Sequence, residues 1–373
     1  MHPKTFKQFR SSLLDWYHIN RRNLPWRNID DPYRIWVSEI ILQQTTVEQG
    51  LSYYLRFIET FKTVYELAAA PEQDVLKLWQ GLGYYSRARN MHHAAQTVVN
   101  SFEGRFPDNH SDIIKLKGIG PYTAAAILSF AFNKPYPVLD GNVIRVVSRL
   151  FGIEDPVDSS KGLNQVKESL NLLFDTQNPA DFNQAIMEFG ATHCRQRNPL
   201  CEECLAKPYC VGFQNNIVSL LPVKSKSIAV RQRYFIYYVP LMSKDGNTYT
   251  FLKKRTGKDI WQNMYDFILF EKETPFNPES FFKSDSYKDF VTHHNLPFKA
   301  PQKTIFISPP VVHKLTHQTI NTFFIIAQTP DFVMPSAFQK VKTNELNTFP
   351  LPKLVENFIE KLKNKNIPTD LIS

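Results

Sequence analysis

The cysteines are the strongest constraint on how this chain folds, because all four lie in one short segment, at Cys194, Cys201, Cys204 and Cys210. Their spacing is C-x6-C-x2-C-x5-C. Two disulfides are disfavoured, because such tight loops would be strained and a reducing cytosol opposes them. Two kinds of metal site remain possible on the same four thiolates: a tetrahedral zinc or an iron–sulfur cluster. Generic zinc ribbons use two C-x2-C pairs and this chain has one, which favours iron–sulfur.

Hydrophobic patterning predicts two domains. Residues 5–222 show apolar residues at helical spacing, including one long helical run over 33–58. Later segments are rich in β-forming residues, with the hairpin signal KDGNT between two of them and an amphipathic helix at the end. We therefore predict a helical domain over 1–222, a linker over 223–228 and an α+β domain over 229–373, in keeping with the chain length.

Charge is unevenly distributed between these parts. Of the net charge of +9, residues 1–222 contribute +1 (23 Lys and Arg against 22 Asp and Glu) and residues 223–373 contribute +8 (21 against 13). A basic region rich in aromatic residues is typical of a nucleic-acid surface or of a solvated basic face, and charge alone favours the latter. No apolar run is long enough to span a membrane, so we expect a soluble protein that is not secreted.

The segment LKGIGPYTAAAILSFAF, residues 116–132, predicts a DNA-binding element. Gly118 and Gly120 bracket a tight turn, and Pro121 opens a helix. A helix N-terminus offers unpaired N–H groups and a positive dipole end to a phosphate. The pattern is that of a helix–hairpin–helix, which contacts the DNA backbone rather than the bases.

Two carboxylates are candidates for catalysis. Glu39 lies within an apolar helix, where burial would raise its pKa and suit it to general acid chemistry, although an exposed helical glutamate explains it equally simply. Asp140 ends an apolar run, and its Asp-Gly-Asn sequence fits a helix N-cap. A capping carboxylate that also faces a cleft satisfies both interpretations of Asp140.

Taken together, the hairpin, the downstream aspartate and the cysteine spacing resemble the endonuclease-III superfamily of DNA base-excision glycosylases. LPWR, SEIILQQTTV, GLGYYSRARN and LDGNVIRV are similar to its branch that removes adenine mispaired with oxidised guanine. The resemblance extends from Leu24 to Cys210. It implies an all-α helix–hairpin–helix glycosylase domain, a 4Fe–4S cluster on the four cysteines of loop 194–210, and a Nudix-like α+β C-terminal domain for lesion recognition. That last domain lacks the acidic Nudix metal motif, which favours recognition over hydrolysis.

The resemblance also implies roles for single residues. Glu39 matches the general acid and Asp140 the carboxylate that stabilises the sugar cation, with both positioned by Tyr122 and Asn142. The adenine pocket would be formed by Trp26, Arg27 and Gln184. Contacts beside the oxidised guanine would come from Gln44, Thr45 and Tyr84, and contacts to the DNA backbone from Gly118 and Gly120. In VHKLTHQTI, His317 matches the histidine of a Phe-Ser-His loop, whereas Leu315 and Thr316 replace its Phe and Ser.

Tyr122 separates the possible activities. Lyase-type relatives carry a lysine at this position that forms a Schiff base, and tyrosine cannot form that imine. We therefore expect base removal without efficient strand cleavage. Two alternatives are a bifunctional glycosylase/lyase acting on oxidised pyrimidines and a non-enzymatic DNA-binding iron–sulfur protein. The expected partner is duplex DNA with A:8-oxoguanine or A:G mispairs. We expect a monomer that acts on nucleoid DNA in a bacterial cytoplasm and does not bind a membrane.

Overall fold

A computed structural model describes residues 3–225, 230–275, 277–293, 297, 303–330 and 333–364. It divides into two compact units, one formed by Met1–Ala69 and Asn90–Ser227, the other by Ala70–Arg89 and Ile228–Ser373. The segment Ala70–Arg89 is thus grouped with the C-terminal part of the chain. Of the predicted linker 223–228, residues 226–228 lie outside the described residues. The limits 1–222 and 229–373 stay a prediction.

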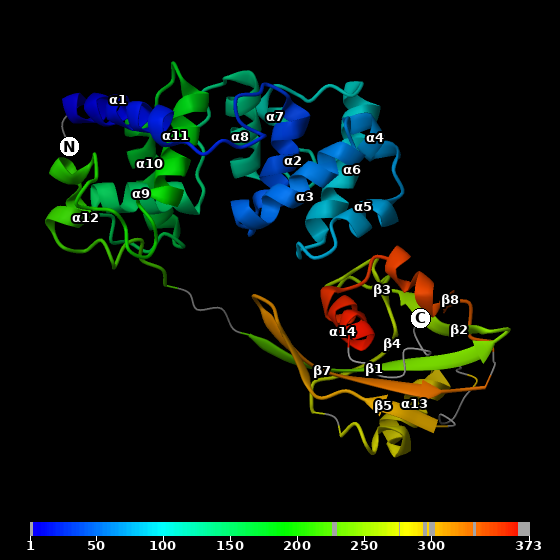
Figure 1. Ribbon diagram of the computed structural model, residues 1–373. Helices are drawn as coiled ribbons and strands as arrows, with labels where there is room; N and C mark the ends of the chain where they lie inside the picture. Colours follow the sequence, from blue (N-terminus) through cyan, green and yellow to red (C-terminus); the bar gives the residue numbers. More distant parts are fainter. Residues whose placement is uncertain are drawn as a thin grey trace. The chain divides into compact units, whose positions relative to one another are not determined.

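Helices make up the regular structure of residues 3–225. In chain order they are α1 (Pro3–Asn20), α2 (Pro32–Leu42), α3 (Val47–Thr60), α4 (Val64–Ala69), α5 (Glu72–Leu78), α6 (Ser86–Phe102), α7 (His110–Ile113), α8 (Pro121–Phe132), α9 (Gly141–Phe151), α10 (Ser160–Leu173), α11 (Pro179–Thr192) and α12 (Val211–Gln214). Within the first unit, α11 packs on α1, α8 and α9, while α2 packs on α3 and α8 (Figure 1). No helix in the described ranges is long and apolar enough to cross a bilayer.

Local signals fix where the helices near the site begin. Asp31 caps α2 and Asp140 caps α9 through their side chains. Gly120 precedes Pro121 at the first position of α8, as predicted. The expected single helical run over 33–58 is wrong: α2 ends at Leu42, Gln44 has a φ of +54°, and Thr46 caps α3. A left-handed residue followed by a capping threonine interrupts the helix, although the apolar spacing continues through it.

The second unit contains a mixed sheet. Its strands are β1 (Arg231–Lys244), β2 (Asn247–Lys254), β3 (Tyr265–Asp266), β4 (Ile268–Lys272), β5 (Lys303–Ile307), β6 (Val311–Lys314), β7 (Gln318–Gln328) and β8 (Phe338–Lys342). The order is β3-β2-β1-β7-β5, with β4 on β1, β6 on β7 and β8 on β2. The central strands β1 and β7 run parallel. The predicted hairpin is confirmed: Asp245 and Gly246, both at positive φ, connect β1 to β2.

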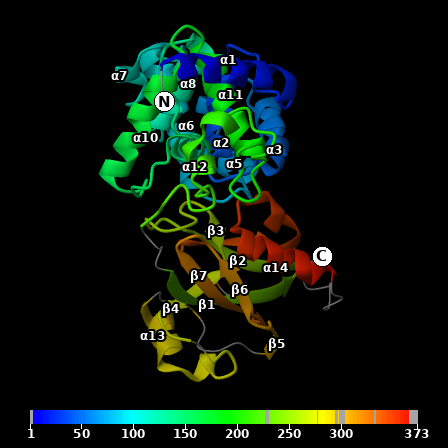
Figure 2. The ribbon, with the colours of Figure 1, turned by 90° about the vertical axis from the view of Figure 1, so that its left-hand side faces the viewer.

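Helices cover both faces of this sheet (Figure 2). On one face Phe358 of α14 (Lys353–Asn364) stacks on Phe324 of β7, with ring centroids 3.7 Å apart. On the other, Tyr287 of α13 (Asp285–His293) belongs to the core that contains Ile325 and Tyr238. Neighbouring residues of a strand point to opposite faces, so Phe324 and Ile325 serve the two cores. This confirms the predicted α+β class.

Candidate active site

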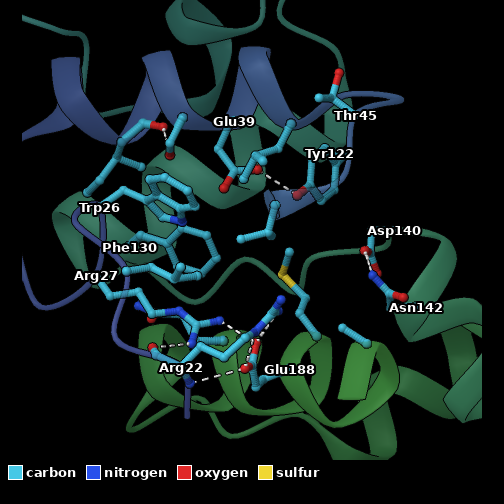
Figure 3. A pocket seen from close by; sticks show the side chains of 18 residues that line it. Arg22, Trp26, Arg27, Glu39, Thr45, Tyr122, Phe130, Asp140, Asn142 and Glu188 are labelled. Atoms are coloured by element: carbon cyan, nitrogen blue, oxygen red, sulfur yellow. Dashed lines mark hydrogen bonds and ion pairs between the residues drawn. The ribbon is translucent and has the colours of Figure 1, made fainter. Parts of the chain in front are cut away.

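A cavity of about 180 Å³ lies between helices of the first unit (Figure 3). It collects residues far apart in the sequence: the segment before α2, then α2, α8, α9 and α11. All seven predicted catalytic and adenine-pocket positions are among its lining, which includes Arg22, Trp26, Arg27, Glu39, Thr45, Tyr122, Phe130, Asp140, Asn142, Gln184, Met187 and Glu188. The structure therefore brings the two candidate carboxylates into one cavity.

Glu39 is buried on α2, with 6% of its surface exposed. The Tyr122 hydroxyl donates a hydrogen bond of 2.5 Å to its Oε2. Burial raises the pKa of Glu39 to about 7; the Tyr122 hydrogen bond opposes the rise, the charge of Asp140 adds to it, and the charge of Arg27 opposes it. A carboxyl with this pKa is protonated in a large fraction of molecules at neutral pH, as a general acid requires.

Tyr122 lies in the first turn of α8, directly after the hairpin glycines. Burial, and then the neighbouring charges of Glu39 and Asp140, raise the pKa of this phenol well above its usual value. It therefore stays protonated and acts as a hydrogen-bond donor. Its backbone position ties this donor to the hairpin, where Gly118 has a φ of +84° and a Cβ would lie 2.8 Å from the Cβ of Asn90. Only glycine fits that turn without strain.

Asp140 both caps a helix and lines the cavity. Its Oδ1 accepts the Val143 backbone N–H at 2.7 Å, and its Oδ2 accepts the Asn142 side-chain amide at 2.7 Å. Burial raises the pKa of Asp140, while these hydrogen bonds favour the anion and oppose the rise. The Asn142 Oδ1 in turn accepts from Arg145 at 2.9 Å. The two interpretations of Asp140 are thus both present in the fold.

The expected adenine-pocket residues also line the cavity. Trp26 packs edge-to-face on Tyr54. Gln184 accepts a 2.8 Å hydrogen bond from the Tyr17 hydroxyl. Arg27 donates to Glu188 at 2.6 Å. Side chains of these types can pack on and hydrogen-bond a purine, so the lining suits a flipped base.

Glu188 is a cavity residue that the sequence interpretation missed. Its carboxylate pairs with Arg22 at 2.7 Å and with Arg27 at 2.6 Å, and only 1% of the residue is exposed. Burial alone would raise the pKa of Glu188, but the hydrogen bonds and charges of the two arginines hold it at about 2. Its position one helical turn after Gln184 on α11 was the available signal, because residues at i and i+4 share a helix face.

The residues expected beside the oxidised guanine belong to both units. Thr45 lines the cavity, whereas Gln44 is exposed, with the left-handed backbone noted above. Tyr84, Thr316 and His317 line a different cavity of about 520 Å³ within the second unit. There the Tyr84 and Thr316 hydroxyls form a hydrogen bond. Trp261 and His313 line the same cavity and were not predicted.

All four cysteines are free and partly buried. The Cys194, Cys201 and Cys210 thiols each act electrostatically on Cys204, so the four groups lie near one another. Burial, more than these neighbours, raises the pKa of Cys204 to about 12. The loop is linked to the cavity, because Arg145, which donates to Asn142, also donates to the Cys194 carbonyl at 2.8 Å.

Comparisons with known proteins agree with this geometry. Residues 37–171 match the HhH-GPD superfamily base excision DNA repair protein family. An adenine DNA glycosylase of Buchnera aphidicola subsp. Baizongia pistaciae is 35% identical over 322 residues, which are 85% of this chain and 86% of that protein. The chain belongs to the adenine DNA glycosylase family. A second member, from subsp. Schizaphis graminum, is 37% identical over 270 residues, 72% of this chain and 76% of that protein.

Solved structures extend the likeness to the fold. A thermostable thymine-DNA glycosylase matches with a TM-score of 0.51 and 30% identity, covering 57% of this chain and 98% of that one. The predicted helix–hairpin–helix glycosylase domain followed by an α+β domain is therefore confirmed at that level of detail. As a member of this family, the chain is a DNA glycosylase of base-excision repair.

Glu188→Gln tests the ion pairs beneath the cavity. Removing the charge leaves Arg27 largely buried and Arg22 without its partner, so we expect a loss of about 3–5 kcal/mol in the free energy of unfolding at pH 7. Because the folded-state pKa is depressed to about 2, the wild-type advantage should persist above the usual glutamate pKa and shrink as pH falls toward 2. Urea titrations at several pH values measure this. The exposed Glu168→Gln is the control, and equal losses in the two variants would contradict the account.

Proposed function

We propose that this chain hydrolyses the N-glycosidic bond of adenine mispaired with 8-oxoguanine, or with guanine, in duplex DNA. The observation that carries the proposal is one cavity that holds a buried, hydrogen-bonded carboxyl, Glu39, and a second carboxyl, Asp140, in a helix-capping environment. Two carboxyl groups in unlike environments suit acid catalysis and cation stabilisation respectively. Adenine would enter this cavity after rotation out of the duplex.

The steps follow from the positions of the protons and charges. Glu39 donates its proton to a ring nitrogen of the flipped adenine, so the base leaves with the electrons of the broken C–N bond. The Asp140 carboxylate stabilises the positive charge that develops on the sugar. Water then attacks the anomeric carbon and gives up its proton to a carboxylate of the cavity. Tyr122 holds Glu39 in place, and Asn142 does the same for Asp140.

The same cavity supports a monofunctional reaction. A lyase step requires an amine that attacks the sugar, and no cavity-lining residue in the described part of the chain is a lysine. Tyr122 occupies the position where the lyase-type relatives carry that lysine. A bifunctional glycosylase/lyase is the alternative, and it predicts a covalent DNA adduct trapped by borohydride.

The purified protein should release adenine from a duplex with adenine opposite 8-oxoguanine. We expect breaks on the adenine strand only after hot alkali, and a loss of about 100-fold or more in the single-turnover rate for Glu39→Gln. Glu48→Gln, an exposed glutamate on α3, is the control and should keep the wild-type rate. Breaks without alkali would favour the lyase, and no breaks at all would leave DNA binding as the function.

The pH dependence of excision should report the Glu39 proton. We expect the rate to fall as pH rises through about 7, because only the protonated carboxyl donates. Tyr122→Phe removes a hydrogen bond that lowers the pKa of Glu39, so the alkaline limb of the profile should move to higher pH. Single-turnover rates from pH 5 to 9 for both proteins test this. A limb that stays in place, or moves to lower pH, would show that Glu39 is not the titrating acid.

We propose further that the four cysteines hold a 4Fe–4S cluster. Four thiols that influence one another fit the donor set in number and chemistry. The Tyr209 hydroxyl beside them is buried and has no hydrogen-bond partner in the described part of the chain, which suits a sulfur acceptor. When bound, the cluster would cross-link the four cysteines of the loop and would take no part in the hydrolysis.

The C-terminal domain is proposed as a Nudix-like module that recognises the lesion. Tyr84, Thr316 and His317 line one cavity that is large enough to admit a nucleobase, which supports their joint role. Lys314 and Arg89 also line it, and their positive charges would favour nearby phosphates.

Thr316→Val tests that module. Loss of the hydroxyl should lower the preference for adenine opposite 8-oxoguanine over adenine opposite guanine by about 3- to 10-fold, the value of one hydrogen bond. His317→Ala should act in the same direction. Single-turnover rates on the two duplexes give the ratio, with the exposed Thr304→Val as control. An unchanged ratio in both variants would remove these residues from lesion recognition.

A further inference from the structure

Arg149 on α9 is a buried cation that pairs with no carboxylate among the residues that the structure describes. Only 2% of the residue is exposed. Its guanidinium donates to five carbonyl oxygens and one sulfur atom: to Val218 and Leu221 from Nε, to Cys194, Arg195 and the Cys194 Sγ from Nη1, and to Gln196 from Nη2. In the described part of the chain, all of its hydrogen-bond acceptors are therefore neutral as long as the cysteine thiols are protonated.

The other buried arginines among the described residues have a carboxylate or an aromatic ring beside the guanidinium. Arg233 pairs with Asp259 and Glu271, and the largely buried side chain of Arg27 likewise pairs with Glu188. Arg87 lies over the ring of Trp79, at 5.2 Å from its centroid. Burying a charge that is not compensated is costly, so a fold keeps it only where something offsets that cost.

The cysteines around Arg149 are the groups that could offset the cost of its buried charge. The Cys194 Sγ lies 3.5 Å from Nη1, and the Cys210 thiol donates to the Arg149 carbonyl at 3.3 Å. The charge of Arg149 also acts on the Cys201 thiol. Both the side chain and the backbone of Arg149 thus face the sulfur atoms, and thiolate ligands carry negative charge.

We infer that Arg149 is the internal counter-cation of the cysteine-bound cluster, an inference that rests on the cluster proposed above. Its N–H group donates to the Cys194 sulfur, and its charge offsets that of the four thiolates. Reduction adds a negative charge, so a fixed cation at this position favours the reduced form and raises the reduction potential. Arg149 acts here as a positioning and tuning residue, not as a catalytic one.

The guanidinium also explains why an arginine occupies this site. Its donors hold carbonyls of 194–196 on one side and of residues 218 and 221 on the other, so it joins the cysteine loop to the chain that follows it. Lysine would keep the charge but could not reach all of these acceptors at once. Charge and geometry can therefore be separated by substitution.

Three variants of the full-length protein separate the effect of the Arg149 charge from that of its hydrogen-bond geometry. Arg149→Met removes the charge, Arg149→Lys keeps it without the fork of donors, and Arg197→Met removes an exposed arginine of the same loop as control. Iron and sulfide content of the wild-type protein comes first. Without iron in the wild type, the cluster itself is refuted; with iron, the variants test Arg149 alone.

The readout is the reduction potential of each iron-containing variant, measured by voltammetry. We expect Arg149→Met to shift the redox equilibrium toward the oxidised form at least tenfold, about 59 mV for one electron, while Arg149→Lys stays close to wild type and Arg197→Met is unchanged. An unshifted Arg149→Met with full iron overturns the inference. If Arg149→Met retains no iron, Arg149→Lys decides: full iron at a near-wild-type potential supports the role of charge, and loss of iron there as well shows that the hydrogen-bonded fork alone matters.

Discussion

The burial of Glu39 is the constraint on which the site depends. A buried carboxyl on a largely apolar helix avoids the cost of a buried charge by holding a proton, and the Tyr122 hydroxyl fixes its direction. Tyr122 can reach it because α2 packs on α8, and α8 begins at the hairpin. The turn proposed to bind the DNA backbone therefore leads directly into the helix that carries the donor to the proposed acid.

Asp140 is held by a different set of interactions, and this is what keeps the two carboxyls unlike. It receives a backbone N–H and a side-chain amide, and its helix start favours negative charge. Asn142 and Arg145 continue the connection to the carbonyl of Cys194. The cysteine loop is thereby linked through hydrogen bonds to the cavity that holds Asp140, so we expect damage to the loop to disturb the position of this carboxyl.

Sequence patterning predicted the parts of this fold that rest on local physics. Asp140 as a cap, Pro121 at a helix start and the Asp-Gly hairpin follow from backbone preferences of neighbouring residues. The break after Leu42 was missed because apolar spacing continues through it. Glu188 was missed because its role depends on Arg22 and Arg27, more than 160 positions away. That Glu39 and Asp140 share a cavity is likewise a product of helix packing, which no local pattern encodes.

Burial keeps Glu39 protonated in a large fraction of molecules near neutral pH. Carbon NMR of the protein labelled at glutamate carboxyls, with Glu39→Gln to assign the signal, measures this proton directly. We expect the Glu39 carboxyl to titrate with a pKa of about 7, which is about three pH units above the ordinary value of a glutamate. A Glu39 signal that titrates with the exposed glutamates would show that the carboxyl is ionised at neutral pH, and would contradict its role as the acid.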